Sequence, residues 1–548
     1  MYAVNMRNIN SLGGKTVQVK LCVDPRVCKR GVHAVVPVPV LPHVHVGVVV
    51  RELEGFQSLN SVKLRVDTVE GDGRGVTFGR LRSVEECERV RNAPAMFELG
   101  GRSVIHVFDG FAKMHSVAIG QHGLNFSSAF LKSSSYTRSK KANRYAPSLT
   151  FLGVDPEFSE LEKVEALLHP FDNTDVNVWK YGHGKNSVYA ALTDEWVYAK
   201  FDLETLATTG VSIPPIDGVH FLTHFVQSCA HPLIEPGTNN SINYVLVPGL
   251  IPGQKQQYYV VRMMNLTSFE IIANFQTDKS TYMHSFGLTK NYVIFFAHPA
   301  IVSVEKMVTT VEVSEAMQWF PDEKTTIVVA NIKTGKVEYL QHDAIFVTHH
   351  ANAYETDDGK IIVDICASDD GISILTQYKI PLLRNQSDLY QSVAQTRFHR
   401  YTIDLANKSV ETKTFRSKDP MQDFLHQIEV PIINENYRAQ HYCYVYGVVL
   451  DFSPSNPVNG SLSIVKKNLC APGKDQVWFH PNHHASEPSF VPNPDGKDED
   501  DGVVLSSVFD AILEKNYLLI LDGKTMKKIN TAYMPTYIPF GFHGRFFS

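Results

Sequence analysis

The chain has 548 residues, of which 43% are hydrophobic and 11% aromatic, a composition typical of a globular protein and too apolar for a disordered one. The formal net charge of −5 and the pI near 6.5 provide no broad basic surface, which argues against a nucleic-acid partner and favours small or apolar ligands. A β-rich closed architecture can hold this length as one unit with a large core.

The first 88 residues carry no pattern that assigns them a role, and we treat residues 1–88 as a divergent N-terminal segment. Valine-rich pieces at 16–22, 47–50 and 62–69 are strand-like. We see no basic region followed by an apolar one, so we predict no signal peptide. The most apolar tract, 35–50, contains three prolines and is too short to span a bilayer as a helix. We therefore expect a cytoplasmic protein.

The cysteines support the same compartment. They are odd in number, scattered and free of CxxC spacing. The sequence therefore predicts reduced thiols at Cys22, Cys28, Cys87, Cys229, Cys366, Cys443 and Cys470.

From Arg91 onward, short apolar runs alternate with Gly, Asn, Asp and Pro turns, which is typical of propeller blades or a large sandwich. We predict strands at 187–192, 196–201, 243–247, 258–262, 291–296, 325–330, 359–365 and 517–521. Helical periodicity is nearly absent, and 304–317 is the best helix candidate. There is no strict repeat of the WD or kelch kind. Residues 89–548 are thus predicted to form one large all-β domain.

A hairpin is predicted where a β-branched run follows the Asp358-Gly359 turn. This places His349, His350 and Asn352 at the end of one of its strands. Because neighbouring side chains of a strand point to opposite faces, at most one of the two histidines can face a given site.

Four histidines have locally distinctive contexts. They are Ala230-His231-Pro232, Tyr282-Met283-His284-Ser285-Phe286-Gly287, His349 in the hairpin and Phe540-Gly541-Phe542-His543-Gly544. They are too dispersed for a helix-borne motif. A closed, radially repeated sheet could gather such distant residues around a metal on its axis.

In these contexts, and in a series of further motifs in fixed order, the chain from about Arg91 onward resembles the carotenoid cleavage oxygenases. The further motifs are Arg91-Asn92-Ala93-Pro94, His106-Val107-Phe108-Asp109-Gly110, Asp172-Asn173-Thr174, Val176-Asn177-Val178, Ser486-Glu487-Pro488, Phe490-Val491-Pro492 and the run from Glu499 to Ser506.

The resemblance implies a seven-bladed β-propeller with a dome of loops and helices over an axial Fe(II). It makes His231, His284, His349 and His543 the iron ligands and catalytic residues, with Asp194, Glu429 and Glu487 as the carboxylates behind them. Neutral imidazoles suit iron and leave coordination positions open for dioxygen. A carboxylate on the other ring nitrogen fixes the tautomer and raises its basicity. We expect the pairs Asp194–His284, Glu429–His349 and Glu487–His543, and no carboxylate at His231.

Two departures from the family's pattern stand out. Asp194 replaces the usual Glu, and a side chain shorter by one methylene is expected to reach His284 through a water or a local shift. Ala93 replaces a turn glycine, which is costly if the position needs a positive φ. Together with the unfamiliar first 90 residues, it suggests an incomplete first blade.

Three further charged clusters are interpreted as structural. The histidines His480, His483 and His484 are expected in a surface loop, the run 498–501 in a solvated turn before a strand, and the basic run 138–144 at the solvated rim, where it could touch anionic lipid headgroups.

By resemblance, the function is Fe(II)-dependent cleavage of a conjugated C=C bond in a carotenoid or apocarotenoid by O2, giving aldehydes such as retinal. The sequence looks closest to the animal branch that acts on β-carotene. The substrate is expected to enter through a dry tunnel lined by aromatic and apolar side chains. Because such substrates are nearly insoluble in water, the mouth of this tunnel is expected to rest on a membrane. No obligate protein partner is evident. One alternative is a retinoid isomerohydrolase, which the absence of any cysteine between Cys87 and Cys229 disfavours. The other is a catalytically decayed propeller that binds lipophiles.

Overall fold

The computed structural model describes residues 87–547 except 121–122, 170, 217–225, 250–253, 386–394, 452–456 and 458–461, together with strands β1 (Ala3–Val4), β2 (Leu21–Cys22) and β3 (Leu59–Leu64). The chain divides into two compact units, Met1–Gly47 and Val48–Ser548. In the first, β1 pairs with β2. The predicted strand at 47–50 lies outside the described residues. Within the described parts, no helix is long and apolar enough to cross a membrane.

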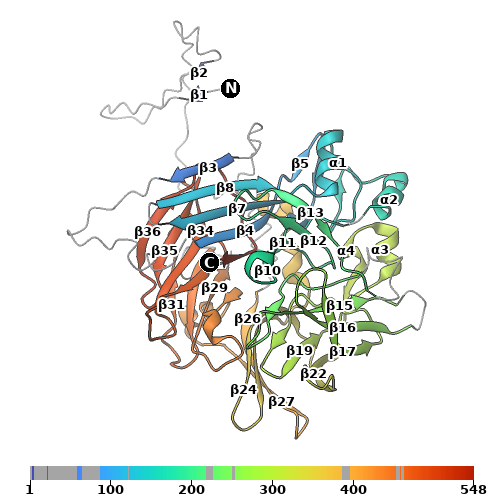
Figure 1. The fold of residues 1–548 in the computed structure, drawn as a ribbon, viewed down its shortest axis with the longest axis vertical. Helices are drawn as coiled ribbons and strands as arrows, with labels where there is room; N and C mark the ends of the chain where they lie inside the picture. The colour runs from blue at the N-terminus through green and yellow to red at the C-terminus, as the bar shows by residue number, and fades with distance from the viewer. Residues whose placement is uncertain are drawn as a thin grey trace, which may run out of the picture. The chain divides into compact units, whose positions relative to one another are not determined.

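The second unit is mostly antiparallel β-sheet, as predicted (Figure 1). Its four-stranded sheets follow one another along the chain, and the strands of each are given in spatial order. The first two are β10 (Asn177–Tyr181), β11 (Val188–Leu192), β12 (Tyr198–Phe201) and β13 (Thr208–Ser212), and then β14 (Leu233–Ile234), β15 (Ser241–Val247), β16 (Gln256–Met263) and β17 (Phe269–Thr277). The next three are β18 (Gly287–Leu288), β19 (Tyr292–Ala297), β22 (Thr325–Asn331) and β23 (Val337–His342); then β24 (Phe346–Glu355), β25 (Ile361–Ser368), β26 (Arg397–Asp404) and β27 (Ser409–Thr414); and last β28 (Glu429–Ile432), β29 (Tyr444–Leu450), β30 (Leu462–Asn468) and β31 (Gln476–Trp478).

Two further sheets have five strands. One joins β32 (His483–Ala485), β33 (Ser489–Pro492), β34 (Gly502–Asp510), β35 (Lys515–Asp522) and β36 (Lys528–Tyr533), and the other joins β3, β8 (Gly123–Phe130), β7 (Phe111–Gly120), β4 (Cys87–Ala95) and β37 (His543–Phe547). The blue β4 and β7 lie beside the red-orange β34 and β35 in Figure 1, and side chains of β7 and β8 share a buried cluster with those of β34 and β35. These two sheets therefore pack side by side, and the second of them joins β37, at the end of the chain, to β4.

The β4 strand is regular where the sequence suggested strain. Ala93 is fully buried opposite Lys113, and the positive φ of this region lies at Met96, at 56°. The expected cost of alanine does not arise, because the position is a strand residue and not a left-handed turn. With five strands, the sheet that contains β4 is also not the incomplete one that we expected.

A buried guanidinium holds the pairing of β37 with β4. Arg91, with an exposed fraction of 0%, donates from Nη1 to Glu487 Oε2 at 2.5 Å. Its Nη2 donates to the carbonyl oxygens of Gly541 and Phe542, each at 3.0 Å. Since His543 faces Asn92 across the two strands, this contact fixes the backbone that carries His543.

The helices are short. They are α1 (Ser134–Ala142), α2 (Glu160–Leu167), α3 (Val304–Thr310), α4 (Val313–Ala316), α5 (Ser373–Thr376), α6 (Ile380–Arg384) and α8 (Pro420–Phe424). The predicted helix at 304–317 is broken between α3 and α4. Val311 adopts a left-handed φ of 56°, its carbonyl accepts from the Thr150 N–H, and the Val313 N–H donates to the Thr150 carbonyl. These bonds to a neighbouring segment replace bonds that would continue the helix.

The cysteine prediction is wrong at one pair. Cys443 and Cys470 form a disulfide between the start of β29 and the turn after β30, with Cα atoms 5.1 Å apart. Cys229 and Cys366 are buried free thiols. The paired cysteines are 27 positions apart, and the strands between them form a hairpin that brings the two together, a proximity that spacing alone does not reveal.

The acidic run is not a solvated turn. Glu499 and Asp500 are buried; Glu499 accepts from the backbone N–H groups of Cys443 and Tyr444, and Asp500 pairs with Lys466 Nζ at 2.6 Å. Buried carboxylates need such partners, and these come from the neighbouring sheet.

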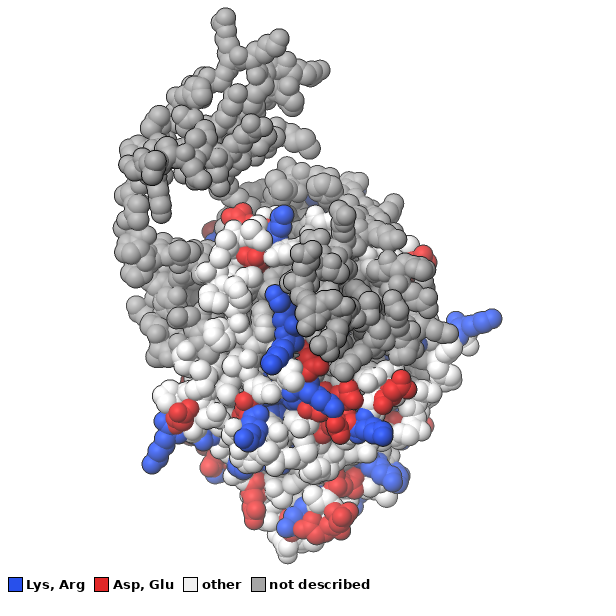
Figure 2. Space-filling view, turned by 90° about the vertical axis from the view of Figure 1, so that its left-hand side faces the viewer, with Lys and Arg blue, Asp and Glu red and all other residues white. Residues whose placement is uncertain are grey.

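The histidine cluster is also placed differently. His483 and His484 lie in β32, where both are half-buried and Nδ1 of His483 lies 2.8 Å from the hydroxyl of Tyr517, so the expected surface loop is wrong for these two. His480 is exposed in a loop, as predicted. The basic run is surface-located as predicted, with Lys140, Lys141 and Arg144 exposed around α1. On the face shown in Figure 2, basic and acidic side chains are interspersed.

We predict that Arg91→Met lowers the free energy of unfolding by about 3–5 kcal/mol, because it leaves Glu487 buried without its cation. Urea denaturation with a fluorescence readout measures the change. The exposed pair Lys324–Asp343 provides the control, since Lys324→Met should change stability by less than about 1 kcal/mol. Equal urea midpoints for the two variants would show that Arg91 stabilises the fold no more than an exposed ion pair does.

Candidate metal centre

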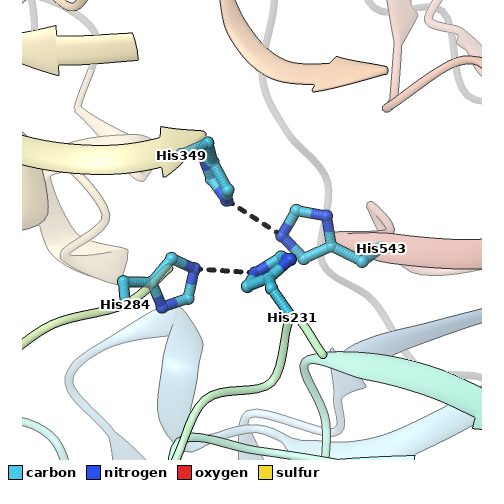
Figure 3. Close-up of side chains that lie close together, drawn as sticks. All are labelled: His231, His284, His349 and His543. Carbon is cyan, nitrogen blue, oxygen red and sulfur yellow. Dashed lines mark hydrogen bonds between the residues drawn. The ribbon is translucent and has the colours of Figure 1, made fainter. Parts of the chain in front are cut away.

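The four histidines meet at one point from four different sheets. His231 precedes β14, His284 precedes β18, His349 lies within β24 and His543 begins β37. Their ring nitrogens all lie within 4.8 Å of one another. Nε2 of His231 is 3.0 Å from Nε2 of His284, and Nε2 of His349 is 3.2 Å from Nε2 of His543 (Figure 3).

Two irregularities in β24 orient its adjacent histidines. The pairing with β25 shifts register between Val347 and His349 and again between His350 and Asn352. Such bulges redirect side chains. His349 turns to the centre, whereas Nδ1 of His350 lies 2.7 Å from the Ser285 hydroxyl on the other face. The predicted hairpin is correct, but both histidines lie in mid-strand and not at its end, because β24 continues to Glu355.

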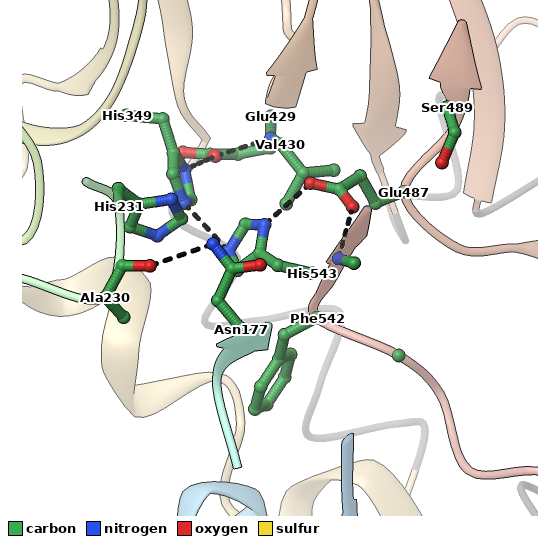
Figure 4. A network of polar contacts seen from close by, with 12 residues as sticks. Asn177, Ala230, His231, His349, Glu429, Val430, Glu487, Ser489, Phe542 and His543 are labelled. Atoms are coloured by element: carbon green, nitrogen blue, oxygen red, sulfur yellow. Dashed lines mark hydrogen bonds and ion pairs between the residues drawn. The ribbon is translucent and has the colours of Figure 1, made fainter. Parts of the chain in front are cut away.

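A carboxylate stands behind each of three imidazoles. The distances are 2.7 Å from Asp194 Oδ2 to His284 Nδ1, 2.6 Å from Glu429 Oε2 to His349 Nδ1, and 2.7 Å from Glu487 Oε1 to His543 Nδ1. Figure 4 shows the pairs of Glu429 and Glu487. These are the three pairs expected from the resemblance. When Nδ1–H donates to the carboxylate, Nε2 keeps its lone pair and faces the centre.

The shorter Asp194 reaches its histidine without a bridging water. Its Oδ2 also accepts from the Tyr282 hydroxyl at 2.7 Å, and its Oδ1 accepts from the Ala230 N–H at 3.2 Å. The expectation of an indirect contact is therefore wrong. Burial would raise the pKa of Asp194, but His284 and these donors outweigh it and hold the pKa below its usual value.

Glu429 is oriented in the same way by groups that the sequence reasoning missed. Its Oε1 accepts from the Thr348 hydroxyl, and its Oε2 accepts from the Val430 N–H at 2.8 Å. Thr348 directly precedes His349, and Tyr282 lies two residues before His284. A hydroxyl residue next to a candidate ligand is the signal that could have indicated both.

His231 has no carboxylate within the described residues, and its loop is held by other groups. The His231 N–H donates to Cys229 Sγ at 3.2 Å, and the Cys229 thiol donates to the His284 carbonyl at 2.9 Å. Asn177 Nδ2 donates to the Ala230 carbonyl at 2.8 Å, as Figure 4 shows. Cys229 thus links the two loops that carry His231 and His284, a role that the cysteine count gave no reason to expect.

The donor set fits a metal ion. Burial, and then the neighbouring imidazoles, lower the pKa of His231 well below its ordinary value, so this ring is neutral. Burial likewise lowers the pKa of His543 to about 4, against the effect of Glu487. Facing lone pairs 3.0 Å apart repel each other unless a cation lies between them. This separation is that of adjacent ligands whose bonds to a metal are about 2.1 Å long.

An apolar cavity opens at the histidines. His284, His349 and His543 lie in its wall. Aromatic side chains form much of the remaining wall, namely Phe108, Phe151, Phe171, Tyr282, Phe346, Tyr378 and Phe542. A cavity with this apolar and aromatic lining can hold a hydrophobic molecule beside a metal.

We predict that Asp194→Asn weakens metal binding by about 10–100-fold, because the imidazole of His284 loses its charged partner. Titration of metal-free protein with Co²⁺, followed by visible absorption, measures the affinity. Asp202, whose carboxylate accepts from Thr205 in an exposed turn, supplies the control variant Asp202→Asn. Asp194→Glu should bring no gain in affinity, since Asp194 already makes the contact; a tighter site in that variant would contradict this account.

Comparisons with known proteins identify the family of the chain. The family model of the retinal pigment epithelial membrane protein, RPE65, matches residues 88–548. The carotenoid isomerooxygenase of Galleria mellonella is 28% identical, covering 86% of this chain and 93% of its own. The β,β-carotene 15,15'-dioxygenase of Gallus gallus is 27% identical, covering 85% and 94%.

Solved structures match as well. The cobalt-substituted Synechocystis apocarotenoid oxygenase (ACO) has a TM-score of 0.72 at 23% identity, covering 89% of this chain and 96% of its own. An ACO/RPE65 chimera has a TM-score of 0.69 at 22% identity, covering 89% and 94%. Since the family model spans nearly all of the second unit, the chain belongs to the RPE65 and carotenoid oxygenase family.

Proposed function

We propose that the protein is a non-haem iron oxygenase that cleaves a conjugated C=C bond of a carotenoid or apocarotenoid with O2. One double bond and one O2 yield two carbonyl products, with retinal as an example. The observation that carries the proposal is the convergence of four imidazole Nε2 atoms, three of them from histidines in the wall of an apolar cavity. The names of the relatives, which are carotenoid-cleaving enzymes, support the substrate class.

The proposed ligands are His231, His284, His349 and His543, and the proposed metal is Fe(II). Bound there, iron supplies the redox chemistry that joins O2 to the polyene. The chain's own part is to orient the imidazoles through Asp194, Glu429 and Glu487, whose charges offset that of the metal. Aromatic walls align the polyene and exclude water.

The fold proposal is that the seven larger sheets of the described residues are the seven blades of a propeller, with the site on its axis. The pairing of β37 with β4 supports a closed ring, since it puts strands from both ends of the second unit in one sheet. We keep 89–548 as the oxygenase domain and 1–88 as a divergent segment of unknown role; the family match from residue 88 supports this boundary.

We predict that the iron-loaded protein converts β-carotene to aldehydes in air and not under argon, and that iron removal by a chelator abolishes turnover. Chromatography of the products measures how much aldehyde forms under each condition. A parallel incubation with retinyl ester tests the isomerohydrolase alternative, which would give retinol without O2. His349→Ala should lose both iron and activity, whereas His350→Ala, whose side chain points away from the centre, should keep iron. Iron-loaded protein that turns over neither substrate would be a lipophile-binding protein instead.

A membrane contact is proposed at α2. Leu161, Val164 and Leu168 are exposed by 84%, 57% and 73% at helical spacing. Arg138 of α1 pairs with Glu165 of α2 at 3.3 Å, which places the basic run beside this apolar stripe. An apolar helix face flanked by basic residues suits an anionic lipid surface. Leu167 of α2 belongs to the same apolar cluster as Leu149, which lines the cavity, so the contact lies near the substrate's route.

We predict that the variant Leu161→Ser/Val164→Ser/Leu168→Ser binds vesicles of phosphatidylcholine and phosphatidylserine several-fold more weakly, as measured by sedimentation. Each substitution removes an apolar side chain that the wild type would bury in the lipid. Ile512 and Leu513, exposed in the β34–β35 turn, give a control pair of serine variants that should bind as the wild type does. Similar losses in both would place the contact elsewhere.

The cytoplasmic location stays a prediction; a curated relative from Mustela putorius furo, 29% identical, is named a mitochondrial enzyme.

A further inference from the structure

Five carboxyl groups line the apolar cavity within the described residues, and three of them have full partners. Asp194 and Glu429 hold the imidazoles of the metal centre. Asp109 accepts from the backbone N–H groups of Phe151 and Leu152, at 2.5 and 3.1 Å. These three carboxyl groups are therefore accounted for by the fold and the metal site.

Asp175 and Glu195 are not accounted for in this way. Asp175 is 2% exposed, and its Oδ2 has no hydrogen-bond partner among the described residues. The same is true of Glu195 Oε2, although the Glu195 side chain borders the cavity directly after Asp194 in the chain. Buried polar atoms are nearly always paired, so two unpaired oxygens in one cavity wall indicate a partner that enters the cavity.

The surroundings of both groups favour the neutral acid over the carboxylate. Burial raises the pKa of Asp175 and of Glu195 well above the ordinary range, and the charge of Asp194 adds to the effect at each. No lysine or arginine is found in the described lining of the cavity to pair with either carboxyl group. A neutral carboxyl group offers one O–H donor and one carbonyl acceptor. That pair of functions matches a hydroxyl or a carbonyl oxygen.

We propose that Asp175 and Glu195 bind an oxygen function of the substrate, so that the enzyme acts preferentially on carotenoids or apocarotenoids that carry a hydroxyl or carbonyl group, and less well on hydrocarbon carotenes. The inference rests on the proposed function and specifies its substrate class. A hydrocarbon polyene would leave both buried acids without a partner, and a cavity that contains unpaired polar groups rejects such a ligand.

The test compares kcat/KM for zeaxanthin, which has a hydroxyl on each ring, for a long-chain apocarotenal and for β-carotene, with iron-loaded wild type. The expected preference for an oxygenated substrate is about tenfold, the size of one hydrogen bond gained at a buried site. Asp175→Leu and Glu195→Met remove the hydrogen bonds at similar volume and should bring the ratio of kcat/KM values towards one. Asp175→Asn and Glu195→Gln retain a donor and an acceptor and should preserve the preference.

A matched control is Glu355→Gln. The carboxylate of Glu355 lies outside the cavity lining and accepts from Thr289 and Asn291, so its replacement should leave the substrate ratio unchanged. Each ratio is measured within one preparation, which cancels differences in iron content between variants.

Two outcomes overturn the inference while the proposed function stands: equal kcat/KM values for β-carotene and the oxygenated substrates in the wild type, or a preference that survives in both apolar variants. The latter result would mean that ordered water satisfies the acids. If the apolar variants fail to fold, the wild-type ratio alone decides. Absence of cleavage of any carotenoid would refute the proposed function and the inference together.

Discussion

Three hydrogen bonds from imidazole N–H groups to buried carboxylates are the constraint on which the rest of the site depends. They decide which nitrogen of each ring faces inwards, and therefore whether the rings present lone pairs or protons to the centre. Each carboxylate must itself be kept charged in a buried place, and the structure supplies Tyr282, Thr348 and Arg91 for that purpose. The polar network thus extends one layer beyond the histidines, into the strands that build the sheets.

The strand pattern of the chain was largely predictable because it depends on local chemistry. Alternating apolar runs and Gly or Asp turns correctly placed β11, β12, β15, β16, β19, β22, β25 and β35, and the Asp358-Gly359 turn located the β24–β25 hairpin. What remained hidden depends on neighbours distant in sequence. The break at Val311 is set by hydrogen bonds to Thr150. The register shifts in β24 orient His349 towards the other three histidines, and local strand propensity does not predict them.

The four histidines could be selected because each has a distinctive local context and because the order of motifs resembles a family. Their supports could not. Cys229 and Arg91 owe their importance to the loops and strands that pack on them, and neither stands out by residue type. Composition also misled at Glu499 and Asp500, where a run of like charges suggested solvent; the partners of these carboxylates lie on β29 and β30. Charge patterns indicate burial only when the opposing surface is known.

The pairing of β37 with β4 has a consequence for biosynthesis. Polypeptides fold as they leave the ribosome, with the earlier segments able to form first. Three imidazoles of the centre emerge well ahead of the fourth, which arrives on β37 about two hundred residues after His349. A nascent chain can therefore bring together at most three of the four imidazoles, and the set is complete only once β37 has docked against β4. Because β37 is made after the other strands that the structure describes, the four-histidine centre is completed only late in biosynthesis.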